Sequence, residues 1–309
     1  MAQMKINLLI LLISNLIFFS FLSFAAESQL IDKLIVENIE VSEKVDSMAD
    51  TLDIWLATKR QTLEPNKTKL ILKNDFVSKE NSELEYTPYI DIDLHLPQLQ
   101  EKWQISFSNY DRLEDERESF KNSSGHSQLD QKNYLGLSFT RNIGNLDFSF
   151  HPQFDLGSKL YTRYILQLQN VMLKKAKHQF NTVLKFIGDT EKGVGQIVLW
   201  EYRFEFLPHW TFNQALLEEY FDGTNEFVFS TRTGVTRSFL RRRSLGLVFN
   251  TTSNNRPSYH LAQYSIQMPW QHEPLKNVFR YEVTPFVEFK KENAFVDVPG
   301  LALSTEIQF

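Results

Sequence analysis

The sequence predicts an all-β protein: a transmembrane antiparallel β-barrel of about fourteen strands, with a short helical segment before it. Three observations favour this fold. From about residue 66 onward, apolar and polar residues alternate with a period of two, which gives each strand one apolar and one polar face. Most alternating segments are roughly ten residues long, enough for a tilted strand to cross a bilayer. Short turns also alternate with longer polar loops, as in transmembrane barrels.

Residues 1–25 are predicted to be a signal peptide. Lys5 supplies the positive charge, residues 6–24 are almost entirely apolar, and small residues at Ser23 and Ala25 allow cleavage after Ala25. A retained anchor helix is the alternative, since the apolar run is about long enough to span a bilayer. Export of a chain without Cys suits the periplasm or the outer membrane better than a small disulfide-stapled secreted domain.

Residues 26–65 are expected to form a periplasmic and largely helical segment. Val41, Val45, Met48, Leu52 and Trp55 recur at spacings of four and three, which places them on one stripe of a helix. Such a stripe packs against another surface, and the sequence leaves open whether that surface is a partner, the periplasmic side of the barrel or its pore.

Residues 66–309 are predicted to be the barrel. Its strand count is uncertain by about two, so the expected range is roughly 12 to 16. The candidate strands cover residues 67–77, 86–96, 102–110, 132–142, 145–156, 160–172, 178–188, 195–207, 210–220, 225–237, 242–251, 257–268, 277–289 and 299–309.

A soluble β-sandwich would also alternate, but three features oppose it. Charged residues recur in mid-strand on the polar faces, as a wet lumen requires. Aromatic residues gather near strand ends, where membrane interfaces would lie. Only 11 Gly are present, which is few for the many tight turns of a sandwich.

Composition narrows the function. The chain has 33 Lys+Arg against 38 Asp+Glu, so it lacks the strongly basic surface that a nucleic-acid binder uses. The absence of Cys excludes disulfides, thiolate metal sites and cysteine nucleophiles. The 26 Phe are diluted by polar residues at every second position, which fits an apolar face that turns outward into lipid.

The end of the chain resembles a known signal. Residues 301–309 resemble the terminal strand of bacterial outer-membrane β-barrel proteins, with alternating apolar positions and a final Phe at Leu303, Ile307 and Phe309. Residues 200–210 and 279–293 are similar to an uncharacterised group of proteobacterial barrel proteins. The resemblance implies a Gram-negative outer membrane as the location and the barrel assembly machinery as a partner, and it implies no activity.

The polar strand faces supply the candidate lumen. If neighbouring strands stack these charges, they either line a pore that passes a small solute or form ion pairs that fill the barrel. The sequence therefore predicts a non-enzymatic, structural or pore-forming protein. The predicted lumen residues are Asp91, Asp93, Asp147, Arg163, Glu201, Arg203, Glu205, Arg232, Arg280, Glu282 and Glu288.

A lipid-modifying hydrolase is the enzymatic alternative. Ser258 and His260 are two apart near the external end of a strand, so they would share the lipid-facing side with Tyr264. There a serine could attack a lipid ester with the histidine as base. No acidic or amide group stands in a matching position to orient the histidine.

A third possibility is a docking or assembly protein. It would act through residues 27–65, together with basic turns at 174–177 and 241–243. The long loop 111–131 is expected to be an external lid or a disordered segment. No histidine pair has metal-site spacing, and no phosphate-binding or dinucleotide motif occurs, so neither a metal nor a cofactor is expected. The expected partners besides the assembly machinery are outer-membrane lipid and a small solute.

Overall fold

The fold was obtained as a computed structural model of the whole chain. The structure describes residues 35–36, 38–44, 46–47, 51, 68–80, 82–95, 103–109, 113, 134–143, 146–155, 161–175, 177–190, 193–240 and 242–309. The predicted signal peptide, most of the 111–131 loop, and the helix-stripe residues Val45, Met48, Leu52 and Trp55 lie outside the described residues.

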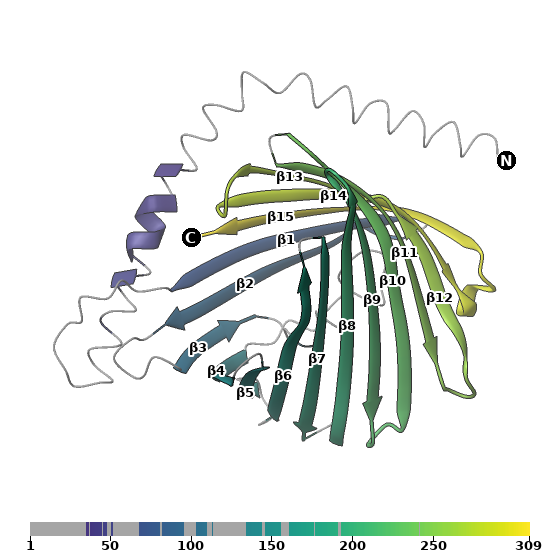
Figure 1. Cartoon of the computed structure of the whole chain (residues 1–309), viewed down its shortest axis with the longest axis horizontal. Coiled ribbons are helices and arrows are strands. Elements are labelled where there is room, and N and C mark those ends of the chain that lie inside the picture. The colour runs from purple at the N-terminus through teal and green to yellow at the C-terminus, as the bar shows by residue number, and fades with distance from the viewer. Residues whose placement is uncertain are drawn as a thin grey trace.

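Fifteen β-strands and one short 3-10 helix follow one another along the barrel part of the chain (Figure 1). They are β1 (Lys69–Lys79), β2 (Glu85–His95), β3 (Trp103–Ser108), β4 (Tyr134–Ile143), β5 (Leu146–Asp155), β6 (Tyr161–Lys175), β7 (His178–Asp189), β8 (Gly193–Leu207), β9 (Trp210–Phe221), β10 (Glu226–Phe239), β11 (Arg243–Asn254), β12 (His260–Gln267), β13 (Trp270–Leu275), β14 (Phe279–Lys290), η1 (Lys291–Asn293) and β15 (Asp297–Gln308).

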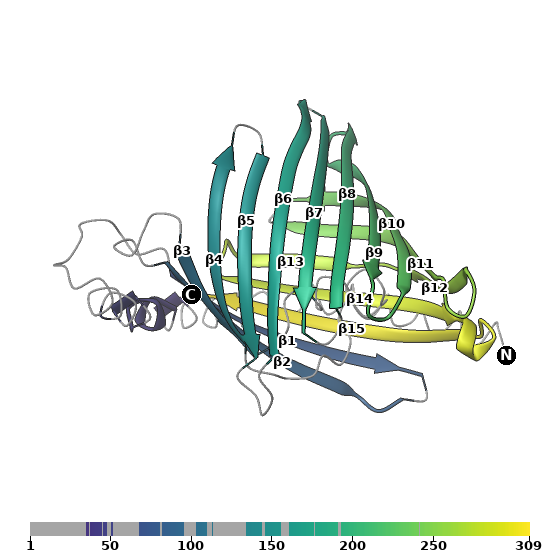
Figure 2. The same ribbon diagram turned by 90° about the horizontal axis from the view of Figure 1, so that it is seen from below.

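The sheet closes on itself, and every strand pairing in it is antiparallel. β1 pairs with both β2 and β15, which joins the first strand to the last, and β10 pairs with both β9 and β11. Figures 1 and 2 show the strands curving around a common interior. β12 and β13 occupy one position between β11 and β14, so the barrel has 14 strand positions, each of which we call a stave. This confirms the predicted fold class and strand number.

The interruption between β12 and β13 corrects one prediction. The sequence suggested a strand over 257–268 followed by a turn that contains His272, whereas β13 continues the stave and pairs with β11 and β14. Pro269 has no N–H and cannot donate to the ladder. Hydrogen bonding nevertheless runs through the break, because Met268 N donates to Pro285 O at 3.0 Å and Gly246 N donates to Pro269 O at 2.8 Å.

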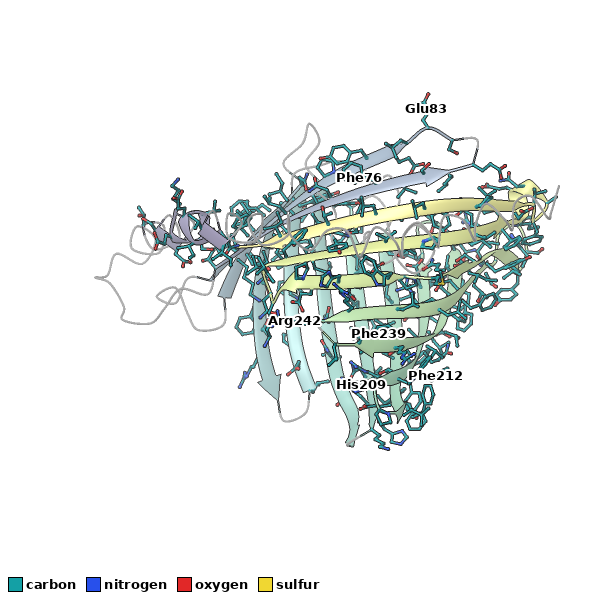
Figure 3. The ribbon with its side chains drawn as sticks, turned by 90° about the horizontal axis from the view of Figure 1, so that it is seen from above. Phe76, Glu83, His209, Phe212, Phe239 and Arg242 are labelled. Carbon is teal, nitrogen blue, oxygen red and sulfur yellow. The ribbon has the colours of Figure 1, made fainter. Side chains whose placement is uncertain are left out.

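Strand register fixes which side chains face out. Along the staves, one alternating series carries most of the large apolar residues, as lipid-facing positions should, and the intervening residues face the interior. Outward examples from six staves are Ile90, Phe186, Phe206, Leu247, Ile266 and Leu303, and Figure 3 shows side chains on both sides of the wall.

The two ends of the barrel differ, and we name them by their connections. The turn end carries the short connections β4–β5, β6–β7, β8–β9, β10–β11 and β13–β14, together with the start of β1 and the end of β15. The loop end carries the connections β1–β2, β3–β4, β5–β6, β7–β8, β9–β10, β11–β12 and β14–β15. Chain closure continues to the last residue, since the backbones of Leu70 and Phe309 exchange hydrogen bonds of 3.2 and 2.8 Å.

The helix before the barrel lies near the β1–β15 seam at the turn end. Residues 38–44 are helical, and Asn38 Nδ2 donates to Gln308 O at 2.7 Å. Ile39 on this helix is 52 % exposed. Of the residues that the structure describes, none belongs to a helix long and apolar enough to cross a membrane.

One glycine in the wall gives a stability test. Gly300 faces inward opposite Phe286, and a Cβ on Gly300 would overlap the Phe286 ring, which is itself 3 % exposed. Because the ring covers the glycine backbone, we expect Gly300→Val to destabilise the barrel by about 1–3 kcal/mol, the usual cost of overpacking. The midpoint of urea unfolding in lipid vesicles measures this loss.

The matched control for this test is Gly188→Val. Gly188 faces outward, and nothing lies within 4 Å of a Cβ added there. The control should leave the midpoint unchanged. Equal midpoints for wild type and Gly300→Val would contradict the overlap.

Candidate functional site in the lumen

The charges predicted to line the lumen all fall at inward register positions. Asp91 and Asp93 are on β2, Asp147 on β5, Arg163 on β6, Arg232 on β10, the acidic and basic residues 201, 203 and 205 on β8, and residues 280, 282 and 288 on β14. They do not form one uniform lining, because burial separates them into two groups. Glu201, Arg203, Glu205 and Arg280 are exposed to the interior near the turn end, whereas Asp91, Arg163 and Glu288 are buried.

The turn-end half of the lumen is open and polar. A cavity of about 470 Å³ lies against the inner wall of β7 to β11, and its polar lining includes Asn181, Glu201, Arg203, Asn213 and Arg232. Register explains the grouping, because Glu201 pairs with Ala215 on β9, and Ala215 pairs with Arg232 on β10. Both charge signs and neutral amides therefore face one aqueous space.

Arg232 on β10 interacts with residues of other strands that surround this space. Its Nε donates to Asn250 Oδ1 at 3.2 Å, and Asn250 is 2 % exposed, so the side chain is held from β11. The charges that act on the Arg232 guanidinium are the carboxylates of Glu282 on β14 and Glu201 on β8. Arg232 is thus a cation held from β11 on which carboxylates of two other strands act.

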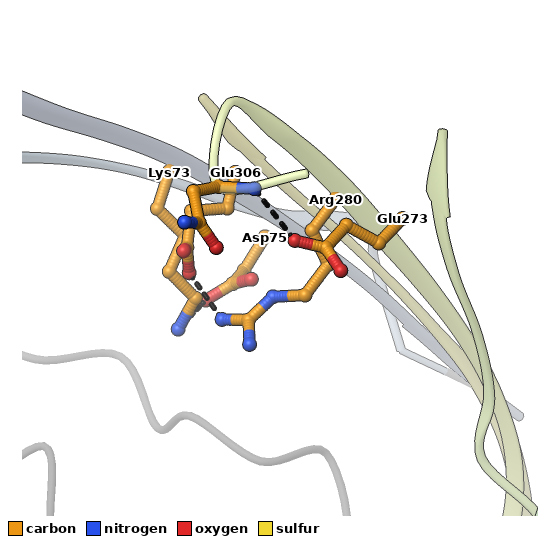
Figure 4. A network of polar contacts seen from close by, with 6 residues as sticks. Lys73, Asp75, Glu273, Arg280 and Glu306 are labelled. Carbon is orange, nitrogen blue, oxygen red and sulfur yellow. Dashed lines mark hydrogen bonds and ion pairs between the residues drawn. The ribbon is translucent and has the colours of Figure 1, made fainter. Parts of the chain in front are cut away.

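A second polar group lines the seam where the chain closes. Lys73 Nζ lies 3.2 Å from Asp75 Oδ2 on β1, and Lys73 is the register partner of Glu306 on β15. Arg280 on β14 forms an ion pair with Glu306 (Figure 4). A cavity of about 230 Å³ adjoins these side chains. The Arg280–Glu306 pair joins β14 to β15, and the Lys73–Asp75 pair lies beside it on β1 on the inside of the barrel.

The loop-end half is packed, which the sequence analysis missed. Inward residues of β6 to β9 form a buried apolar cluster, and Leu113 from the long β3–β4 connection belongs to it at 4 % exposure. The loop expected to be an external lid or disordered therefore places Leu113 inside the lumen. The clue in the sequence was that these staves carry apolar residues, such as Ile187 and Ile197, at inward positions among the polar ones. The cluster comprises Leu113, Ile165, Val183, Ile187, Ile197, Leu199, Ala215, Leu217 and Phe221.

Ion pairs accompany this packing. Arg163 Nε donates to Asp189 Oδ2 at 3.0 Å, and the two side chains are 3 % and 0 % exposed. They are register partners on β6 and β7. Lys79 and Lys290 lie 3.7 and 3.6 Å from Glu288 Oε1. The Arg163–Asp189 pair joins β6 to β7 on the inside of the wall.

The proposed catalytic pair has a different arrangement from that expected. Ser258 lies in the loop before β12, and His260 Nδ1 lies 2.6 Å from the backbone oxygen of Ser258. A bulge in the β11–β12 pairing sets Leu261 opposite Ser253 and Tyr264 opposite Thr251. Leu261 therefore shares the outward side with Tyr264, and His260 does not follow that series. Among the described residues no group of His, Asp or Glu is arranged to hold a metal ion.

Comparisons with known proteins give structural likeness only. No family model matches the sequence, and no curated protein matches it. The outer membrane channel DcaP of Acinetobacter baumannii is similar in structure, with 6% identity, a TM-score of 0.47, and coverage of 79% of this chain and 97% of that chain. OccK5 (OpdH) of Pseudomonas aeruginosa gives 10% identity, a TM-score of 0.45, and coverage of 81% and 99%. Because both TM-scores are below 0.5, we infer the barrel from the strand pairing described above and not from these likenesses.

Proposed function

We propose that this protein is an outer-membrane barrel that passes small polar solutes through its lumen. The observation that carries the proposal is the cavity of about 470 Å³ lined by exposed charges of both signs, Glu201 and Arg203 among them. Lumen charges in a structural plug would be paired and buried, whereas these face open space. A wet, charged lining is what a polar solute needs to leave bulk water.

The outer-membrane location has separate support. The outward faces of the staves are apolar, as lipid requires, and the chain ends in an alternating strand whose outward residues include Leu303 and Ile307. Recognition of that strand by the assembly machinery, and export by a cleaved signal peptide, belong to the same proposal.

The packed loop-end half would control passage. A solute that enters from the turn end meets the apolar cluster around Leu113 after the charged cavity. Leu113 and the inward residues of the wall narrow the lumen there, so a small solute should pass and a large one should not. Mixed charge in the cavity favours solutes that carry both donors and acceptors.

Planar-bilayer recording tests the pore. We expect the refolded full-length chain to give discrete conductance steps in potassium chloride, and we expect removal of residues 111–131 to enlarge them, because that segment supplies Leu113. A variant with the β7–β8 turn residue Thr190 replaced by Ala serves as the control, since Thr190 lies at the same end outside the cluster. A folded chain that gives no steps in either form would refute the pore.

A further inference from the structure

The outer surface of the barrel carries an unusual group at the turn end of β9 to β11. Register on β10 and β11 places Arg237, Phe239 and Arg243 on the outward side: Phe239 pairs with Arg243, and Arg237 lies two residues before Phe239 on the same stave. Two arginines therefore flank one exposed phenylalanine on the lipid-facing surface. Figure 3 labels Phe239 and the neighbouring Arg242 of the connecting turn.

Aromatic rings fix the first arginine. The Arg237 guanidinium carbon lies 5.3 Å from the centre of the Trp210 ring and 4.9 Å from the centre of the Phe239 ring. Two cation–π contacts hold the planar group in place and leave its N–H groups available to a ligand. Arg237 is exposed, and no carboxylate among the described residues forms an ion pair with it.

The second arginine, Arg243, lies next to β13 of the neighbouring stave. Arg243 pairs in register with His272, whose Nδ1 lies 3.0 Å from the hydroxyl of Tyr281. The Nε of Arg243 is buried without a hydrogen-bond partner within the described part of the chain. A buried donor without an acceptor costs free energy. The Arg243 side chain as a whole is only partly buried, so the rest of its guanidinium can face a ligand.

Among the described residues near the turn end of these strands, the acids face inward, away from the two arginines. Glu205 has an inward position on β8, and Glu273 lines an inner cavity with Arg280 and Glu306. Arginine on a lipid-facing surface is costly at the bilayer midplane and nearly free of cost close to the interface. Arg237 lies two residues before the end of β10 and Arg243 is the first residue of β11, so both stand at the turn end, where the headgroups of a membrane would lie.

We propose that Arg237 and Arg243 bind the phosphate of an anionic phospholipid at the turn-end rim, with its acyl chains along the apolar surface above. Guanidinium groups match phosphate with paired hydrogen bonds, and Trp210 supplies the ring that membrane interfaces favour. Outward Leu245 and Leu247, which are 38 % and 59 % exposed, continue from the arginines toward mid-barrel and give the chains an apolar track. This lipid site is independent of the proposed pore.

Native mass spectrometry of the refolded full-length protein in a neutral maltoside detergent tests the site. The probe is dioleoylphosphatidylglycerol, with dioleoylphosphatidylcholine as the neutral comparison. Wild type should retain the anionic lipid in preference to the neutral one. Because each basic residue near an anionic surface contributes about 1 kcal/mol, the R237Q/R243Q variant should weaken this retention by about tenfold or more.

Two further variants keep the test decisive. Arg141→Gln removes one positive charge from another exposed, outward position near the turn end of β4, and it should retain the lipid as wild type does. R237K/R243K keeps the positive charge and should retain most of the binding if the glutamine variant fails to fold. Equal retention by wild type and R237Q/R243Q, equal retention of both lipids, or displacement by inorganic phosphate at millimolar concentration would overturn the proposal.

Discussion

Asp189→Ala is expected to lower the free energy of unfolding by about 3–5 kcal/mol, because it leaves the buried Arg163 guanidinium without its carboxylate. The pair spans β6 and β7 with both side chains almost fully removed from solvent. An intact buried ion pair contributes little net free energy to stability, but replacing only one of its partners lowers the free energy of unfolding by a large amount. The urea midpoint of the barrel in lipid vesicles measures the effect.

Two controls separate charge burial from simple loss of an acid. Asp147 is an inward acid that is exposed near the turn end, so Asp147→Ala should change the unfolding free energy by less than about 0.5 kcal/mol. Replacing both partners, Arg163→Met with Asp189→Leu, should restore most of the stability, since no unpaired charge remains. If Asp189→Ala and Asp147→Ala unfold at the same urea concentration, the buried pair does not have the role assigned to it.

Arg232→Glu should make the proposed pore strongly cation-selective. The substitution removes the cation that stands between Glu201 and Glu282 and adds a third carboxylate to the same space. At the effective dielectric of such a site, a change of two charges amounts to more than 1.4 kcal/mol for a passing ion, which is about tenfold in the permeability ratio. The reversal potential across a potassium chloride gradient measures that ratio.

The matched variant is Lys177→Glu, which makes the same change in net charge in the exposed β6–β7 turn outside the lumen. Its reversal potential should stay close to that of wild type, and higher salt should shrink the effect of Arg232→Glu by screening. An unchanged reversal potential for Arg232→Glu would mean that ions do not pass beside Arg232.

Much of the wall could be predicted, because alternation with a period of two is a local property. Trp200, Phe204 and Phe206 stand at outward positions of β8, and the charges between them stand at inward ones, as the sequence indicated. The continuation of the stave beyond Pro269 could not be predicted. A proline usually interrupts a strand because it has no N–H to donate. Here the hydrogen bonds of Gly246 and Pro285, on neighbouring strands, continue the ladder past Pro269.

The lumen was harder to predict than the wall. The sequence placed Arg163 and Glu201 in one class because both occupy polar-face positions of predicted strands. In the structure Arg163 is 2 % exposed in a packed half, whereas Glu201 is exposed in the open half. What separates them is Leu113, from a loop far away in the chain, and loop placement has no periodic signature.

The arginine pair on the outer rim shows the same division. The sequence placed Arg237 at the end of a predicted strand and Arg243 in a basic turn, and only the β10–β11 register brings them to the two sides of Phe239. The sequence by itself determined a barrel with apolar residues outward and charges inward, because side-chain alternation along a strand depends on backbone geometry alone. The tertiary structure decided which charges meet, which are buried and where the lumen is filled, because those depend on contacts between strands and loops distant in sequence.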